Sequence, residues 1–280
     1  MDTRPIGIFD SGVGGLAVTF EIDRQLPHER LIYYADSGRC PYGVRPVEQI
    51  RALSVACVGF LIEQGAKLIV VACNTASSAA LHHLRAVYPA TPIVGMVPAV
   101  KPAALTTRSG KVAVLATLAT SKGAALADVI SQFAQGVEVN IIAPPGLVER
   151  VERGEVNTLA TRDLLRSYIE PLLERDVDTL VLGCTHFPFL SNAIESITQG
   201  RMQLIDSSPA VARQTARVLA QHDLVAPATQ VGGLRQMTLY TSGDPAIVER
   251  TARTLLGFDV KVIHHVASAS ELVDTFITRS

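Results

Sequence analysis

The sequence lacks three features that mark specialised classes of protein. Its 25 Lys and Arg residues stand against 26 Asp and Glu, a net charge of −1, and the missing basic surplus argues against a dedicated binder of nucleic acid or anionic membranes. No apolar run reaches the length of a membrane span. The first residues, MDTRPIGIFDSG, lack the basic region and apolar stretch of a signal peptide. We therefore expect a soluble cytoplasmic protein with a small-molecule partner and no nucleic-acid or membrane partner.

Cysteine is also scarce, with only Cys40, Cys57, Cys73 and Cys184 in the chain. Disulfides are rare in the cytoplasm, so these side chains are expected to be reduced and to serve thiol chemistry, metal ligation or packing. Cys57 lies in the apolar, helix-like stretch IRALSVACVGFLIEQ. We expect it to be a core residue.

What the sequence does contain indicates an α/β fold. The 280 residues, 48% of them hydrophobic, suffice for one large or two ordinary domains. Short runs rich in Val, Ile and Leu, such as KLIVVA and TLVLG, alternate with helix-like stretches such as 47–64 and 158–175. Continuous apolar strands between helices are typical of mostly parallel sheets covered on both faces.

A repeat divides this pattern into two halves. Cys184 follows Cys73 by 111 residues, and the tripeptide Pro-Ala-Val at 209–211 follows that at 98–100 by the same interval. We predict two pseudo-symmetric α/β domains, the first formed by 1–97 plus a returning C-terminal segment, 207–280, and the second by 98–206. In open α/β sheets ligands bind at the carboxyl ends of the strands, so the active site is expected in the cleft between the domains.

The two repeated cysteines suggest the chemistry. Each ends an apolar strand and precedes hydroxyl or amide groups, in ACNTAS and GCTHFP. A helix N-terminus after each would lower its pKa from about 8.5 toward neutrality. Two thiols on opposite sides of one ligand suit proton removal and return at a carbon with inversion. Racemisation uses such a mirrored pair, with Asp10 and His186 each expected to assist one thiol.

Three other hypotheses remain open at this stage. Gly12, Gly14 and Ala17 match a relaxed dinucleotide-binding pattern, with Asp36 near the expected position of the ribose ligand. A zinc site of a hydrolase or lyase could instead use Cys73, Cys184, His186 and Asp10. In the third hypothesis one cysteine is a nucleophile and His186 is its base.

The motifs together resemble those of the bacterial glutamate racemases. DSGVGGL at 10–16, PYG at 41–43, ACNTAS at 72–77 and GCTHFP at 183–188 occur in that family's order at similar spacing, and TSGDP at 241–245 is similar to its C-terminal segment. The resemblance implies a racemase that interconverts L- and D-glutamate without a cofactor or metal and supplies D-glutamate for peptidoglycan. It also implies two pseudo-symmetric α/β domains.

The resemblance further implies roles for individual residues. Cys73 and Cys184 would be the catalytic acid and base, assisted by Asp10, His186 and Glu152. The substrate contacts would be Asp10, Ser11, Tyr42, Gly43, Asn74, Thr75, Thr117, Thr120, Thr185 and His186. Homodimers are common among soluble proteins in general, so a homodimer is a candidate assembly.

Overall fold

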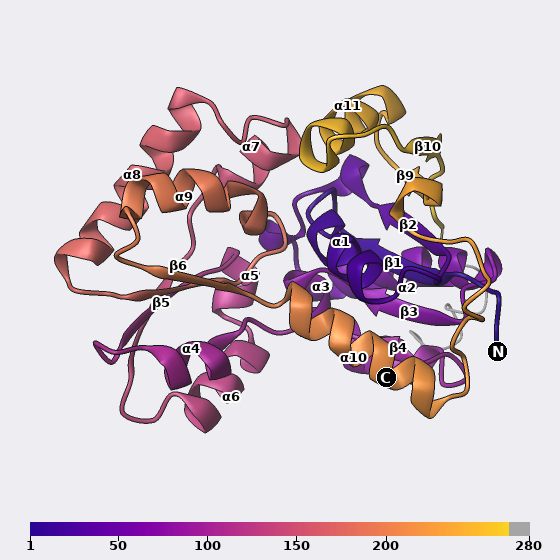
Figure 1. Ribbon diagram of the computed structural model, residues 1–280, viewed down its shortest axis with the longest axis horizontal. Coiled ribbons are helices and arrows are strands. Elements are labelled where there is room, and N and C mark those ends of the chain that lie inside the picture. Colours follow the sequence, from indigo (N-terminus) through magenta and orange to yellow (C-terminus); the bar gives the residue numbers. More distant parts are fainter. Residues whose placement is uncertain (269–280) are drawn as a thin grey trace.

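The computed structural model describes residues 1–268 and contains two halves, each a parallel sheet flanked by helices (Figure 1). The larger sheet has the strand order β10-β9-β2-β1-β3-β4. Its strands are β1 (Ile6–Asp10), β2 (Leu31–Ala35), β3 (Leu68–Val71), β4 (Ile93–Val94), β9 (Thr238–Thr241) and β10 (Lys261–His264). All described pairings in it are parallel.

The smaller sheet repeats the inner part of the larger one. Its strands are β5 (Lys111–Leu115), β6 (Glu138–Ile142), β7 (Thr179–Leu182) and β8 (Gln203–Asp206), in the order β6-β5-β7-β8. The first four strands have the equivalent order β2-β1-β3-β4. The predicted pseudo-symmetry is therefore confirmed, with β3 and β7 as the equivalent strands that precede the two cysteines.

Helices cover both faces of each sheet. They are α1 (Leu16–Gln25), α2 (Val47–Glu63), α3 (Asn74–Val87), α4 (Val100–Thr106), α5 (Leu118–Ser121), α6 (Ala124–Phe133), α7 (Leu147–Glu152), α8 (Leu159–Glu174), α9 (Ser191–Thr198), α10 (Ser208–Gln221) and α11 (Pro245–Leu256). Among the described residues there are also the 3-10 turns η1 (Ser37–Arg39), η2 (Tyr42–Val44), η3 (Phe187–Leu190) and η4 (Leu234–Gln236). Each sheet has a separate apolar core on either face, which explains why the strands β1, β2 and β3 are apolar without alternation.

Part of the C-terminal segment lies against the first half. The strand β9 pairs with β2, and α10 packs beside α1 through Val211, Ala212 and Leu219. The strand β10, which was not predicted from the sequence, lies at the sheet edge, and its end residues are exposed. The domain limits at 97/98 and 206/207 stay a prediction, and residues 269–280 of the returning segment lie outside the described part.

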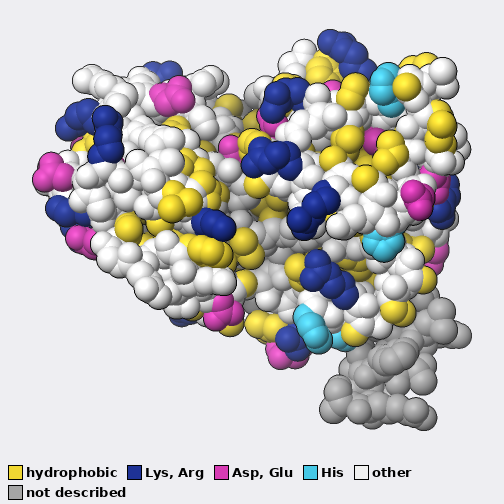
Figure 2. Space-filling view, turned by 60° about the horizontal axis from the view of Figure 1, so that its bottom comes forward, with side chains coloured by type: hydrophobic (Ala, Val, Ile, Leu, Met, Phe, Trp, Pro, Cys, Tyr) yellow, Lys and Arg dark blue, Asp and Glu magenta, His cyan; other side chains and the backbone are white. Residues whose placement is uncertain are grey.

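The two halves meet chiefly at the carboxyl ends of their strands. On another face the molecule is hollowed between them (Figure 2), where a groove of about 500 Å³ separates α4 and α6 from α10. Packing between the halves is thus interrupted at this groove. The candidate site residues lie instead at the carboxyl ends of β1, β3, β5 and β7. None of the helices within 1–268 is long and apolar enough to cross a membrane.

Candidate active site

Cys73 stands at the junction of β3 and α3, where it caps the helix. Its Sγ accepts a hydrogen bond from the N–H of Ala76 at 3.4 Å and lies 3.7 Å from Ser11 Oγ. Burial raises the pKa of the Cys73 thiol well above its usual value, and the neighbouring Asp10 carboxyl adds to the rise. The expected lowering is therefore wrong for Cys73, because the helix N–H acts in that direction but burial outweighs it.

Cys184 occupies the equivalent place after β7. Its Sγ lies 3.6 Å from Nδ1 of His186, whose Nε2 is 2.6 Å from a carboxylate oxygen of Glu152. Burial by itself lowers the pKa of His186, but its contacts with Cys184, Cys40 and Glu152 outweigh burial and raise that pKa well above the usual range. These contacts favour the protonated form of the imidazole, which lies close enough to the second thiol for proton transfer between nitrogen and sulfur.

Asp10 joins the two halves at the end of β1. It is fully buried and accepts hydrogen bonds from the N–H groups of Ser11 and Gly15, at 2.6 and 2.5 Å, and from the hydroxyl of Thr185 at 3.2 Å. Burial raises the pKa of Asp10, an effect that His186 partly offsets. Asp10 thus fixes the glycine-containing loop after β1 and contacts a residue beside Cys184.

The glycines of this loop allow close approach to the second half. Neither Gly12 nor Gly14 has a positive φ, so the freedom of their backbone is not the reason for glycine. A Cβ at Gly12 would meet the carboxylate of Glu152, and one at Gly14 would meet the ring of His186. The N–H of Val13 donates to Glu152 at 2.8 Å. The sequence suggested a dinucleotide-binding loop, and the structure gives the glycines a different explanation.

Three threonines meet across the cleft. Thr75 Oγ1 lies 2.8 Å from Thr117 Oγ1 and 3.4 Å from Thr120 Oγ1, and Thr117 caps the short helix α5. A Cβ at Gly43 would meet the side chain of Thr117. The predicted contact residues of the first half thus lie against those of the second.

Asn74 is the clearest sign of a ligand. Its side chain is 3% exposed, and neither its amide nitrogen nor its amide oxygen has a hydrogen-bond partner in the described part of the chain. A buried amide without partners costs roughly 1–3 kcal/mol. The Asn74 side chain lines the cavity that contains both thiols, so a polar ligand there would supply the missing partners.

The cavity itself is small and closed. It measures about 10 Å³, about enough for one water molecule, and its lining residues are Ser11, Pro41, Tyr42, Gly43, Cys73, Asn74, Thr75, Thr117, Val148, Cys184, Thr185 and His186. A wider hollow of about 270 Å³ adjoins it and shares Pro41, Gly43, Thr117 and Val148. Amino-acid-sized ligands therefore require these walls to move apart.

Tyr42 and Asp36 differ from what the sequence suggested. The Tyr42 hydroxyl donates to Asp36 at 2.5 Å, so it is not directed at a substrate carboxylate. Asp36 is fully buried and also accepts from Ser242 at 2.5 Å and from Arg39 at 3.1 Å. With its carboxylate occupied, Asp36 is not placed to bind a ribose. The tripeptide Asp-Ser-Gly occurs at both 10–12 and 36–38, and this repeat is the sequence signal that could have pointed to the structural role of Asp36.

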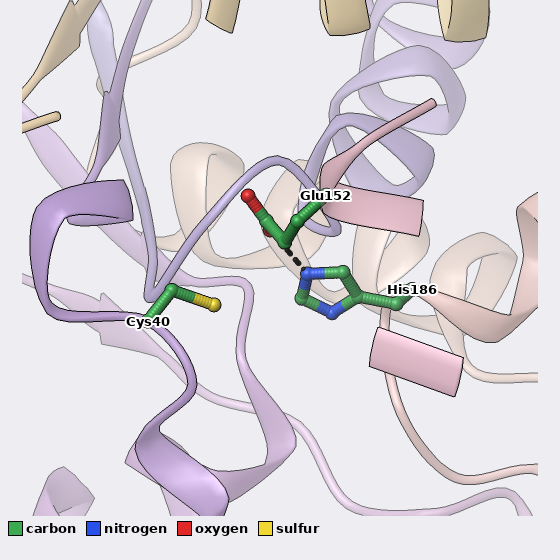
Figure 3. Close-up of side chains that lie close together, drawn as sticks. All are labelled: Cys40, Glu152 and His186. Carbon is green, nitrogen blue, oxygen red and sulfur yellow. Dashed lines mark hydrogen bonds and ion pairs between the residues drawn. The ribbon is translucent and has the colours of Figure 1, made fainter. Parts of the chain in front are cut away.

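The predicted zinc ligands do not converge. Within residues 1–268, the only group of three metal-ligating side chains whose donor atoms all lie within 4.8 Å of one another is Cys40, Glu152 and His186 (Figure 3). Of these, only His186 belonged to the zinc set predicted from sequence. Cys40 points toward the His186 ring (Figure 3).

Comparison with known proteins identifies the family. Residues 6–215 match the family described as Asp/Glu/Hydantoin racemase. The chain belongs to this family. A glutamate racemase from Roseiflexus sp. (strain RS-1) is 49% identical over 257 residues, covering 92% of this chain and 93% of the relative. The match between the two chains thus extends over nearly their full length.

Solved structures of racemases share the fold. The glutamate racemase isoform RacE1 of Bacillus anthracis has a TM-score of 0.83 at 31% identity, with 95% of this chain and 98% of that chain covered. The Escherichia coli glutamate racemase, solved with L-glutamate and the activator UDP-MurNAc-ala, has a TM-score of 0.82 at 34% identity, covering 94% and 98% of the two chains. The predicted fold class is confirmed.

Proposed function

We propose that this chain is a glutamate racemase that interconverts L- and D-glutamate with two thiols and no cofactor. The observation that carries the proposal is the pair Cys73 and Cys184, each at the end of an equivalent strand and both lining one cavity. The proteins to which the chain is similar are glutamate racemases, so we propose glutamate as the ligand. We also propose that the reaction takes place in the cytoplasm, where thiols stay reduced. Its product, D-glutamate, would be supplied for peptidoglycan.

In the proposed reaction one sulfur, as thiolate, removes the α-proton of glutamate and becomes a thiol. The other thiol donates its proton to the opposite face of the carbanion and becomes a thiolate, so the product has inverted configuration and the proton count is unchanged. The carbanion is stabilised by hydrogen bonds to the substrate carboxylate and by exclusion of water. The reverse reaction exchanges the roles of the two sulfurs.

The neighbouring groups support these proton transfers. The buried Cys73 favours its neutral form, which suits a proton donor. His186, held by Glu152, can donate a proton to the Cys184 thiolate and take it back across 3.6 Å. Asp10 orients Ser11 and Thr185 from the ends of two strands. We assign Cys73 and Cys184 as the acid and base, and His186, Glu152 and Asp10 as the groups that assist them.

Substrate binding is assigned to the polar lining of the cavity. The unpartnered amide of Asn74 is proposed to bind the substrate directly. Ser11, Thr75, Thr117 and Thr185 offer hydroxyl groups, and Gly43 brings the backbone close to Thr117. Thr120 is buried, and its hydroxyl accepts a hydrogen bond from the hydroxyl of Thr117 at 3.0 Å. Tyr42 lines the cavity, but its hydroxyl donates to Asp36.

Circular dichroism of L- and D-glutamate solutions tests the activity. With purified protein, EDTA and no added cofactor, both signals are expected to converge to zero. Convergence with aspartate instead would keep the mechanism and change the substrate. No convergence with either amino acid would contradict the proposal and favour the hypothesis of a cysteine nucleophile with His186 as base. Sedimentation equilibrium of the same sample tests the homodimer, which we retain in the proposal.

A further inference from the structure

We propose that Cys40, Glu152 and His186 form an inhibitory binding site for Zn²⁺ or a similar thiophilic divalent cation. The three side chains come from separate segments: the link between η1 and η2, the end of α7, and the turn after β7. Figure 3 shows the Cys40 sulfur and the Glu152 carboxylate directed toward the same side of the imidazole. The fold therefore gathers one sulfur, one oxygen and one nitrogen donor at one point.

The donor set and its spacing suit zinc. Zinc binds thiolate sulfur at about 2.3 Å and imidazole nitrogen at about 2.0–2.1 Å, which puts neighbouring donors of a tetrahedral site about 3.6 Å apart. The donor atoms here all lie within 4.8 Å of one another. Side-chain movements of about 1 Å would complete three ligands, and a water molecule or a substrate carboxylate would take the fourth position.

Glu152 and His186 already form a pair that zinc could enter. A carboxylate oxygen of Glu152 and Nε2 of His186 are 2.6 Å apart, and the N–H of Val13 fixes the same oxygen. A cation bound between them would replace the proton that they share. His186 is 2% exposed, so its position is set by packing and little ordering remains to be done on binding.

Occupancy of this site would inhibit racemisation, a consequence that rests on the proposed function. Zinc bound to His186 would displace a proton from the imidazole, so the ring could no longer donate that proton to Cys184 and take it back. It would also join the two halves, because Cys40 belongs to the first half and the other ligands to the second. Since the closed cavity must open to admit glutamate, this link would hinder substrate exchange.

Metal binding is tested independently of activity. The full chain, freed of metal with EDTA and dialysed under reducing conditions, is titrated with ZnCl₂ in competition with a chromophoric zinc indicator. We expect one site per chain and at least tenfold weaker binding in Cys40→Ser. The matched control Cys57→Ala alters a thiol in the core of α2 and should bind like the wild type. Cobalt(II) should give a thiolate charge-transfer band that Cys40→Ser loses.

Two binding outcomes would overturn the site. One is unchanged zinc affinity in Cys40→Ser, and the other is loss of the site in Cys73→Ala, which would move the metal to the catalytic thiols. In a separate assay, zinc should inhibit racemisation by the wild type reversibly with EDTA, and at least tenfold more zinc should be needed for Cys40→Ser. Zinc binding without any racemase activity would refute the proposed function and leave the metal site standing.

Discussion

At the scale of single residues, the side chains around the cavity differ in how their polar groups are satisfied. Asp10 and Asp36 have their carboxylates fully engaged by the protein, whereas Asn74 has no partner for either end of its amide. Satisfied groups build the site, and the unsatisfied group is left for a ligand. This contrast is the structural reason for proposing Asn74 as a substrate-binding residue.

Asn74→Ala is therefore expected to reduce substrate binding with little effect on stability. Loss of the hydrogen bonds to a charged substrate should lower kcat/KM by about 10- to 100-fold. The melting temperature should stay near that of the wild type, because no protein partner is left unpaired. Steady-state kinetics and calorimetry measure both. An unchanged kcat/KM would show that the amide does not contact the substrate.

The raised pKa of His186 predicts how stability depends on pH. Because folding raises this pKa, the stabilisation is fully present below the usual histidine value of about 6.5 and is lost as pH rises through the folded-state value. Between pH 6.5 and 8 the free energy of unfolding should fall by up to about 1.4 kcal/mol per pH unit from this group.

Urea unfolding at several pH values measures this slope. Glu152→Gln removes the carboxylate that favours the imidazolium, so its slope should be shallower. Glu149→Gln, a matched change on the same helix α7, should keep the wild-type slope. Equal slopes in all three proteins would contradict the assignment of the proton to His186.

At the scale of elements, the strands and the repeat were predicted well because both can be recognised from short stretches of residues. Buried strands such as β3 and β7 consist of consecutive apolar residues, and the 111-residue interval marks their equivalence. The edge strand β10 gave no such signal, since only its middle residues are partly buried. Parallel pairing with β9 forms it, and that depends on tertiary contacts.

The site was predictable to the extent that each residue adjoins a strand end. Both cysteines, Asp10 and His186 met that condition and lie together. The Asp36 network was missed because one of its donors, Ser242, comes from a segment 206 residues away in the chain. The lowered pKa expected for Cys73 failed because sequence shows the helix N-terminus but not the depth of burial.

The loop between β1 and α1 packs its glycines closely against Glu152 and His186 of the second half. Gly14→Ala should reduce kcat strongly, because the added methyl group meets the buried ring of His186. The methyl group added in Gly12→Ala meets the end of the Glu152 side chain, which is flexible and only partly buried. The reduction in kcat should therefore be smaller in this variant. Steady-state kinetics of the two variants compares them. A larger loss in Gly12→Ala would contradict this account of the loop.

At the scale of the whole molecule, two related halves enclose the thiols. Cys73 and Cys184 are 4% and 5% exposed and line a cavity of about 10 Å³. Access to them therefore depends on movement of the walls that the two halves contribute. The groove on the face shown in Figure 2 leaves part of the boundary between the halves unpacked, which lowers the cost of such movement.

Thiol labelling with iodoacetamide, read by mass spectrometry, measures this movement. Cys73 and Cys184 should react slowly, and the fully buried Cys57 only after unfolding. D-glutamate should protect Cys73 and Cys184. Labelling of these two as fast as in the urea-unfolded protein, without protection by D-glutamate, would contradict a closed site between the halves.

The most direct test of the two-thiol account follows solvent deuterium into the α-carbon of L- and D-glutamate in D₂O. Wild-type protein should convert each enantiomer into the other with deuterium in the product, whereas Cys73→Ala and Cys184→Ala should each lose racemisation while keeping the wild-type fold by circular dichroism. Racemisation near the wild-type rate in either single variant would contradict the central claim that both sulfurs are required.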